Sequence, residues 1–137
     1  MEKQGILENL KVLSVVIISL TLFFLPILFF VNATDFFTIP KQLLIIASVI
    51  ILLVIWGIKI LIDRKIVLVI HSLNLPVSAF AVVLIVSALL SRNRYDSLIQ
   101  AVPVVFAILF FFLIVNTIRD RRSFSFVFAG LVLGAAA

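Results

Sequence analysis

The stretch QLLIIASVIILLVIWGIKILI, residues 42–62, decides the fold of this chain. No charged residue lies between Lys41 and Lys59. A helix rises about 1.5 Å per residue, so this stretch would form a helix of about 31 Å, close to the roughly 30 Å of hydrocarbon in a bilayer. The stretch is apolar on every face, which leaves no side for contact with water. It therefore predicts a membrane-spanning helix.

The composition extends this prediction to the whole chain. Of its 137 residues, 65% are hydrophobic and 12% are charged, whereas a soluble domain usually carries about 25% charged residues. Transmembrane β-strands would alternate in polarity, but the apolar runs here are continuous. We therefore predict an all-α fold, a polytopic transmembrane helical bundle that forms a single membrane domain. Its four complete spans and truncated fifth are expected at residues 12–31, 42–62, 76–91, 98–118 and 124–137.

The first apolar run, residues 12–31, has two interpretations. Residues 31–33 offer a small-residue cleavage site, but a signal peptide has an apolar core of about 7–15 residues. The run is longer than such a core, so we favour a retained helix. Pro26 removes one backbone hydrogen bond and is expected to kink this helix. Pro40 is expected in the first turn of the second helix, where its missing N–H costs nothing.

The later runs are less regular. Residues 66–91 hold no charge, and Pro76 divides them into an interfacial or re-entrant lead-in, residues 66–75, and a span. Residues 91–96 are predicted as the loop before the fourth span. The last run would form a helix of about 21 Å, too short to cross the hydrocarbon. We therefore expect the chain to be the N-terminal piece of a longer protein.

The distribution of lysine and arginine favours one orientation. Eight of these residues lie in the N-terminal segment and in the loops after the second and fourth spans, and three lie in the other two loops. Because such residues are enriched in cytoplasmic loops, we predict a multi-pass protein with a cytoplasmic N-terminus. Residues 32–41 and 91–96 would then face outward.

Most kinds of chemistry have no candidate residues in this sequence. It has no cysteine, and its one histidine, His71, has no Asp or Glu within a helical turn, so no metal site is predicted. We interpret His71 as an interfacial polar residue. The sequence lacks a catalytic set, a phosphate-binding loop and a dinucleotide fingerprint, so we assign no catalytic residue and no cofactor. The net charge of +5 resides in the loops, as in membrane proteins, and we expect no binding to nucleic acid.

Arg92 and Arg94 are the candidate substrate-binding residues. Both lie in a loop predicted to face outward, against the usual charge distribution. A guanidinium group can bind phosphate through two hydrogen bonds, so the pair could contact the pyrophosphate of a lipid carrier. Contact with ordinary phospholipid headgroups is the alternative.

Small and polar residues within the apolar runs predict contacts between helices. Gly130 and Gly134 form a G-x-x-x-G motif that permits close packing, and we expect it to serve packing within the chain rather than dimerisation. Polar side chains in the runs can hydrogen-bond between helices or to carbonyls of their own helix. They are Gln100, Asn116, Ser14, Ser19, Ser48, Ser78 and Ser87.

The order of these segments resembles the N-terminal part of the O-antigen ligase and polymerase family of bacterial envelope proteins. The residues that carry the resemblance are Phe36–Lys41 before a helix with Trp56 and Lys59, Asn74–Pro76 at the start of the third span, Ser87–Asn93 at its end, and Ser97–Leu98. Members often have a glycine shortly after the last pair, where this chain has Gln100.

The resemblance implies a multi-span glycosyltransferase. Such proteins transfer a glycan from a polyprenyl-pyrophosphate carrier to an acceptor on the outer face of the inner membrane, and their catalytic residues lie mostly in a large external loop beyond the part that this chain resembles. The implied partners are membrane lipids and a polyprenyl-pyrophosphate-linked glycan. A transporter or channel and a small membrane scaffold are the alternative functions, and the coding sequence downstream of Ala137 would separate them.

Overall fold

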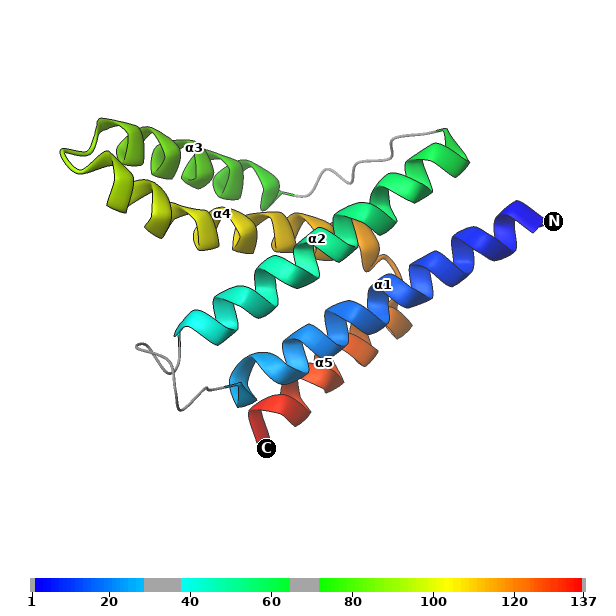
Figure 1. Ribbon diagram of the computed structural model, residues 1–137. Helices are drawn as coiled ribbons and strands as arrows, with labels where there is room; N and C mark the ends of the chain where they lie inside the picture. Colours follow the sequence, from blue (N-terminus) through cyan, green and yellow to red (C-terminus); the bar gives the residue numbers. More distant parts are fainter. Residues whose placement is uncertain (1, 29–37, 65–71, 137) are drawn as a thin grey trace.

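Five helices make up the part of the chain that the structure describes, residues 2–28, 38–64 and 72–136. In this computed structural model they are α1 (Glu2–Ile27), α2 (Thr38–Asp63), α3 (Asn74–Leu90), α4 (Arg94–Thr117) and α5 (Arg121–Ala136) (Figure 1). No strand is present in these ranges. The predicted all-α fold is therefore confirmed.

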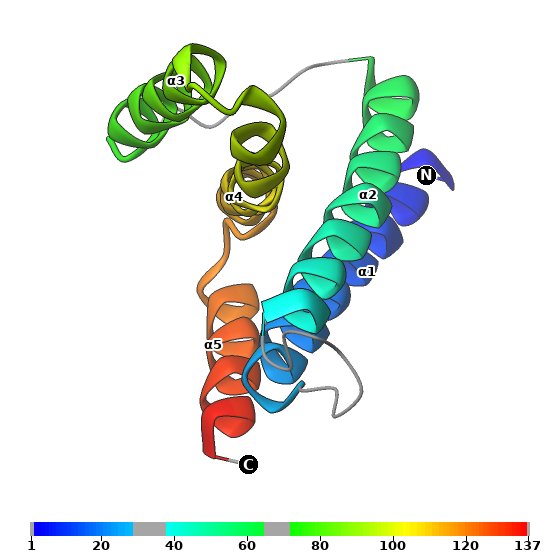
Figure 2. The same ribbon diagram turned by 60° about the vertical axis from the view of Figure 1, so that its left-hand side comes forward.

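The helices are joined by a series of pairwise contacts. α1 and α2 lie side by side and run in opposite directions, and α5 lies along α1. α4 crosses α2, and α3 lies along α4 as the other arm of a hairpin (Figures 1 and 2). Within the described ranges α3 contacts no helix except α4. The α3–α4 hairpin therefore projects from the rest of the bundle.

The core lies where α1, α2, α4 and α5 meet. Ile18 and Val49 are fully buried, and Leu52 is 2% exposed. These three side chains form one cluster with Val15, Phe110, Leu113 and Val127. α3 contributes no residue to this cluster.

Many apolar side chains lie on the outside of this bundle. Three of the described helices are long and apolar enough to cross a membrane: α1 over Lys3–Ile27, α2 over Ile39–Asp63 and α4 over Arg94–Thr117. Exposed apolar surface of this extent is rare on a soluble monomer, so these helices indicate a membrane protein. The helix at the predicted span 76–91, α3, is apolar but has only 17 residues. Of the four spans predicted to be complete, three therefore coincide with a helix that is long enough to cross a membrane.

The observed ends of α1 differ from those of the predicted span 12–31. α1 begins at Glu2, because polar residues such as Lys3 and Glu8 continue the helix beyond the apolar run. It ends at Ile27, so Pro26 lies in its last turn rather than kinking its middle. Helical bonding continues past the proline, since the Leu28 N–H donates to the Phe24 carbonyl oxygen over 2.9 Å.

The second and third predicted spans agree better with the helices. α2 contains residues 42–62, and Pro40 lies in its first turn as expected. α3 begins at Asn74, just before Pro76. Residues 29–31 at the end of the predicted first span, most of the lead-in 66–75, and His71 lie outside the described residues.

α4 begins inside the segment predicted as a loop. Arg94, Tyr95 and Asp96 form its first turn, so the prediction of a loop over residues 91–96 is wrong in its second half. Asn93 donates a side-chain hydrogen bond to the Asp96 carboxylate. A carboxylate in the first turn also interacts favourably with the positive end of the helix dipole. These local interactions favour a helix start in a segment whose composition suggests a polar loop.

Polar side chains inside the helices bond to carbonyl oxygens of the preceding turn, as predicted. Ser14 Oγ donates to the Leu10 carbonyl over 2.8 Å, and Ser48 Oγ donates to the Leu44 carbonyl over 2.7 Å. Thr21, which the sequence analysis does not single out, donates to Ser48 Oγ over 2.7 Å. This bond links α1 to α2 in a setting where few other polar partners exist.

Gly130 and Gly134 bring α5 against α1. A Cβ atom on Gly130 would lie 3.0 Å from the Ser19 carbonyl oxygen. A Cβ atom on Gly134 would lie 2.8 Å from Phe23 Cα. Gly130 meets Ser19, and Gly134, one turn later on α5, meets Phe23, one turn later on α1. α1 and α5 therefore run parallel. The motif therefore packs two helices of the same chain, as predicted.

Candidate functional site

The turn between α3 and α4 carries both predicted substrate-binding residues. Arg92 lies in the turn Ser91–Asn93, and Arg94 is the first residue of α4. Both side chains are exposed. The structure therefore brings the two arginines together at the tip of the hairpin, far from the core.

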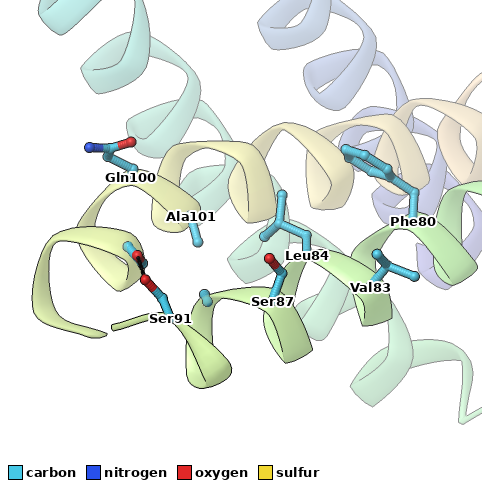
Figure 3. Close-up of a pocket in the computed structure, with 9 residues that line it drawn as sticks. Phe80, Val83, Leu84, Ser87, Ser91, Gln100 and Ala101 are labelled. Carbon is cyan, nitrogen blue, oxygen red and sulfur yellow. Dashed lines mark hydrogen bonds between the residues drawn. The ribbon is translucent and has the colours of Figure 1, made fainter. Parts of the chain in front are cut away.

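An open groove with a volume of about 400 Å³ lies between α3 and α4 beside this tip (Figure 3). Its polar lining comes from the residues nearest the turn, Ser87, Ser91, Ser97 and Gln100. Its apolar lining includes residues of α3 farther from the turn, Phe80, Val83 and Leu84. The groove is thus polar toward the turn that bears the arginines and apolar away from it, and neither arginine is among its described lining residues.

A hydroxyl pair holds the two helices together at the polar end of the groove. Ser97 Oγ donates to Ser91 Oγ over 2.7 Å, and this bond joins the first turns of α4 to the end of α3 (Figure 3). Ser91 and Ser97 enter the prediction only through the family resemblance, and their contact was not predicted. The signal available in the sequence is the presence of a hydroxyl residue on each side of a short turn between two apolar runs.

Among the described residues, the lining of the groove offers no carboxylate or imidazole for acid–base chemistry. Serine hydroxyls and the Gln100 amide can donate hydrogen bonds to anionic oxygens. Asp96, close by in sequence, accepts a hydrogen bond from Asn93. Over the described ranges, no three His, Cys, Asp or Glu residues gather closely enough to hold a metal ion. The arrangement therefore favours binding of an anionic headgroup with an attached hydrocarbon chain.

The remaining polar residues singled out in the sequence do not join this site. Asn116 donates to the Phe112 carbonyl over 2.9 Å at the other end of α4, and Ser78 Oγ donates to the Leu75 carbonyl over 2.9 Å at the start of α3. Ser19 lies between α1 and α5, with its Oγ 3.5 Å from the Phe126 carbonyl oxygen. These side chains satisfy helix carbonyls and have no part in the groove.

Comparison of the chain with protein-family models, with curated proteins and with solved structures finds no match.

Proposed function

We propose that this chain is the N-terminal membrane portion of a glycan ligase or polymerase of the O-antigen ligase type. The whole protein would transfer a glycan from a polyprenyl-pyrophosphate carrier to an acceptor on the outer face of the bacterial inner membrane. The observation that carries the proposal is the position of Arg92 and Arg94 beside a groove that is polar at one end and apolar at the other.

The groove would hold the carrier lipid. Arg92 and Arg94 would donate hydrogen bonds to the pyrophosphate oxygens, since guanidinium groups suit this geometry. Ser87 would add a donor at the polar end, and the first isoprene units would lie against Phe80 at the apolar end. These residues would bind and orient the donor, and the bond-making groups would belong to other parts of the protein.

The proposal includes α3 as a fourth membrane crossing. Its 17 residues carry no charge and would form a helix of about 25 Å. Its one helical neighbour within the described ranges is α4, which is itself long and apolar enough to cross. An antiparallel pair of this kind would carry the α3–α4 turn to the membrane surface.

The proposal also places the N-terminus in the cytoplasm. Lys11 forms an ion pair with Asp120 and lines one cavity with Lys59 and Arg119. The N-terminal segment, the end of α2 and the segment after α4 therefore lie at one end of the bundle, and they hold most of the lysines and arginines. Arg94 lies at the opposite end of α4 from Arg119. The positive-inside rule then favours a cytoplasmic position for the lysine-rich end and an external position for the arginine pair.

Reporter fusions test this orientation. Alkaline phosphatase, which is active outside the cytoplasm, is expected to be active when fused after Asp35 and inactive when fused after Arg121. A reporter that is active only in the cytoplasm should give the opposite pattern at the same two positions. Cytoplasmic activity after Asp35 would contradict the orientation.

The double variant Arg92→Gln/Arg94→Gln tests the function. In phosphatidylcholine nanodiscs, we expect the intact chain to be stabilised thermally by a polyprenyl pyrophosphate. The double variant should bind this lipid about tenfold to hundredfold more weakly, because it loses two charge-assisted contacts.

The matched control is Arg121→Gln/Arg122→Gln, which removes the same charge at the other end of the bundle and should leave the affinity unchanged. An equal loss in both double variants would indicate a general effect of charge. Phosphatidylglycerol could also stabilise the chain as much as the polyprenyl pyrophosphate does, and the Arg92/Arg94 variant could lose that stabilisation too. This would show that the two arginines simply contact phospholipid headgroups. Either result would overturn the proposed function.

A further inference from the structure

A second cavity, with a volume of about 350 Å³, lies at the opposite end of α4 from the groove. Residues from the first turns of α1, the last turns of α2 and the end of α4 line it together. These segments are far apart in the sequence, so only the folded bundle creates this cavity. We name it the basic cavity, because Lys11, Lys59 and Arg119 all contribute to its wall.

The charges around the basic cavity do not balance. Lys11 is paired with Asp120, and Asp63 contributes a carboxylate to the lining. Among the described residues, three cations therefore line the cavity with one carboxylate, and a second carboxylate, Asp120, lies against Lys11. The lining is positive on balance, which favours an anion.

Lys59 is the cation whose surroundings are least favourable to it. Its side chain is partly buried, and it is subject to the positive charges of Lys11 and Arg119. Removing a charged amine from water costs free energy unless an opposite charge compensates. The arrangement thus favours a bound anion that contacts Lys59 directly.

The rest of the wall is apolar and aromatic on one part and polar on another, where Asn116 and Thr117 line it. Leu7, Trp56 and Ile60 line the same cavity, and tryptophan is enriched where membrane hydrocarbon meets the headgroups. A free phosphate ion would use only the charged and polar groups of this wall, whereas the glycerol and upper acyl chains of a lipid would also pack against its apolar part. Basic pockets between transmembrane helices are a known way to bind anionic headgroups.

We propose that the basic cavity binds the phosphate headgroup of an anionic membrane phospholipid, with Lys59 as the principal contact and Trp56 beside the lipid backbone. The bound lipid would bridge α1, α2 and α4 at the end of the bundle where their charged segments converge. This site is separate from the groove at the α3–α4 turn and does not depend on the proposed function.

The test compares three ligands on the purified chain in a neutral detergent. Phosphatidylglycerol is expected to raise the temperature of unfolding, while phosphatidylcholine and inorganic phosphate at equal concentration should not. Lys59→Gln should weaken phosphatidylglycerol binding about tenfold, the usual effect of losing one charge-assisted contact. Without added lipid this variant should be at least as stable as the parent chain, because it removes a partly buried charge. The lost lipid response therefore cannot be attributed to misfolding.

Lys3→Gln is the matched control, since it removes the same charge from an exposed position on α1 that does not line the cavity. It should keep the full response to phosphatidylglycerol. Equal stabilisation of the parent chain and Lys59→Gln by phosphatidylglycerol would overturn the proposal, and so would equal stabilisation of the parent chain by inorganic phosphate. Lys59→Gln should also keep its affinity for polyprenyl pyrophosphate, which separates this site from the groove.

Discussion

Gly134→Ala is expected to destabilise the bundle by about 1–3 kcal/mol, the usual cost of forcing extra volume into a packed interface. The new methyl group would lie 2.8 Å from both the carbonyl carbon and the Cα of Phe23. These are backbone atoms, so no side-chain rotation can make room. α1 and α5 would have to separate, and they would lose the close contact on which helix association in lipid depends.

Gly57→Ala is the matched control for this variant. Gly57 lies within α2, and a Cβ atom there would meet nothing within 4 Å. Since alanine favours a helix over glycine by about 1 kcal/mol, this substitution should be neutral or stabilising. Unfolding in mixed micelles with increasing dodecyl sulfate would measure both variants. If both variants changed the free energy of unfolding in the same direction, the contact with Phe23 would not limit the packing of α5.

Leu52→Ala is expected to cost about 2 kcal/mol. Leu52 is 2% exposed and lies in the core cluster between α1, α2 and α4. In a soluble protein such a change costs roughly 2–5 kcal/mol, which includes both the transfer from water and the cavity that remains. In lipid the transfer contribution largely disappears because the acyl chains are equally apolar. The lost dispersion contacts around the cavity remain.

Leu61→Ala provides the comparison, since it is the same substitution on the same helix. Leu61 is 77% exposed, so its side chain would contact lipid in both the folded and the unfolded bundle. We expect a change within about 0.5 kcal/mol, as for most exposed positions. A loss at Leu61 as large as that at Leu52 would mean that the core cluster is not where α2 packs against its neighbours.

The existence of the helices was predictable because uninterrupted apolar runs have few stable backbone conformations in lipid. Their ends were less predictable, because hydropathy indicates which residues favour contact with lipid and does not indicate where a helix begins or ends. α1 extends back to Glu2 through polar turns, and α4 begins at Arg94 through contacts of Asn93 and Asp96. Such extensions consist largely of polar residues, for which the apolar pattern carries no information.

The pairing of the helices was mostly unpredictable. A helix that is apolar all round has no polar face to show which side is buried. Gly130 and Gly134 gave the one clear signal, since only small residues allow such close approach, whereas the bond between Thr21 and Ser48 has no equivalent signature. The arginine pair was chosen as a candidate site from its charge, and its role stays a prediction, whereas the groove near it depends on how closely α3 and α4 approach one another. The basic cavity was likewise hidden, because Lys11, Lys59 and Arg119 appear in the sequence as separate loop charges.

The unequal lengths of α2 and α3 have a consequence for the surrounding bilayer. The 26 residues of α2 would extend about 39 Å, and the 17 residues of α3 about 25 Å, against a hydrocarbon thickness near 30 Å. The longer helix relieves the mismatch by tilting, whereas a crossing by the shorter one requires the lipid beside it to thin. Only α4 flanks α3 within the described ranges, so its other sides would meet this thinned lipid directly. The hairpin tip with Arg92 and Arg94 would then sit in a local depression of the membrane surface, where the phosphate layer dips toward the midplane.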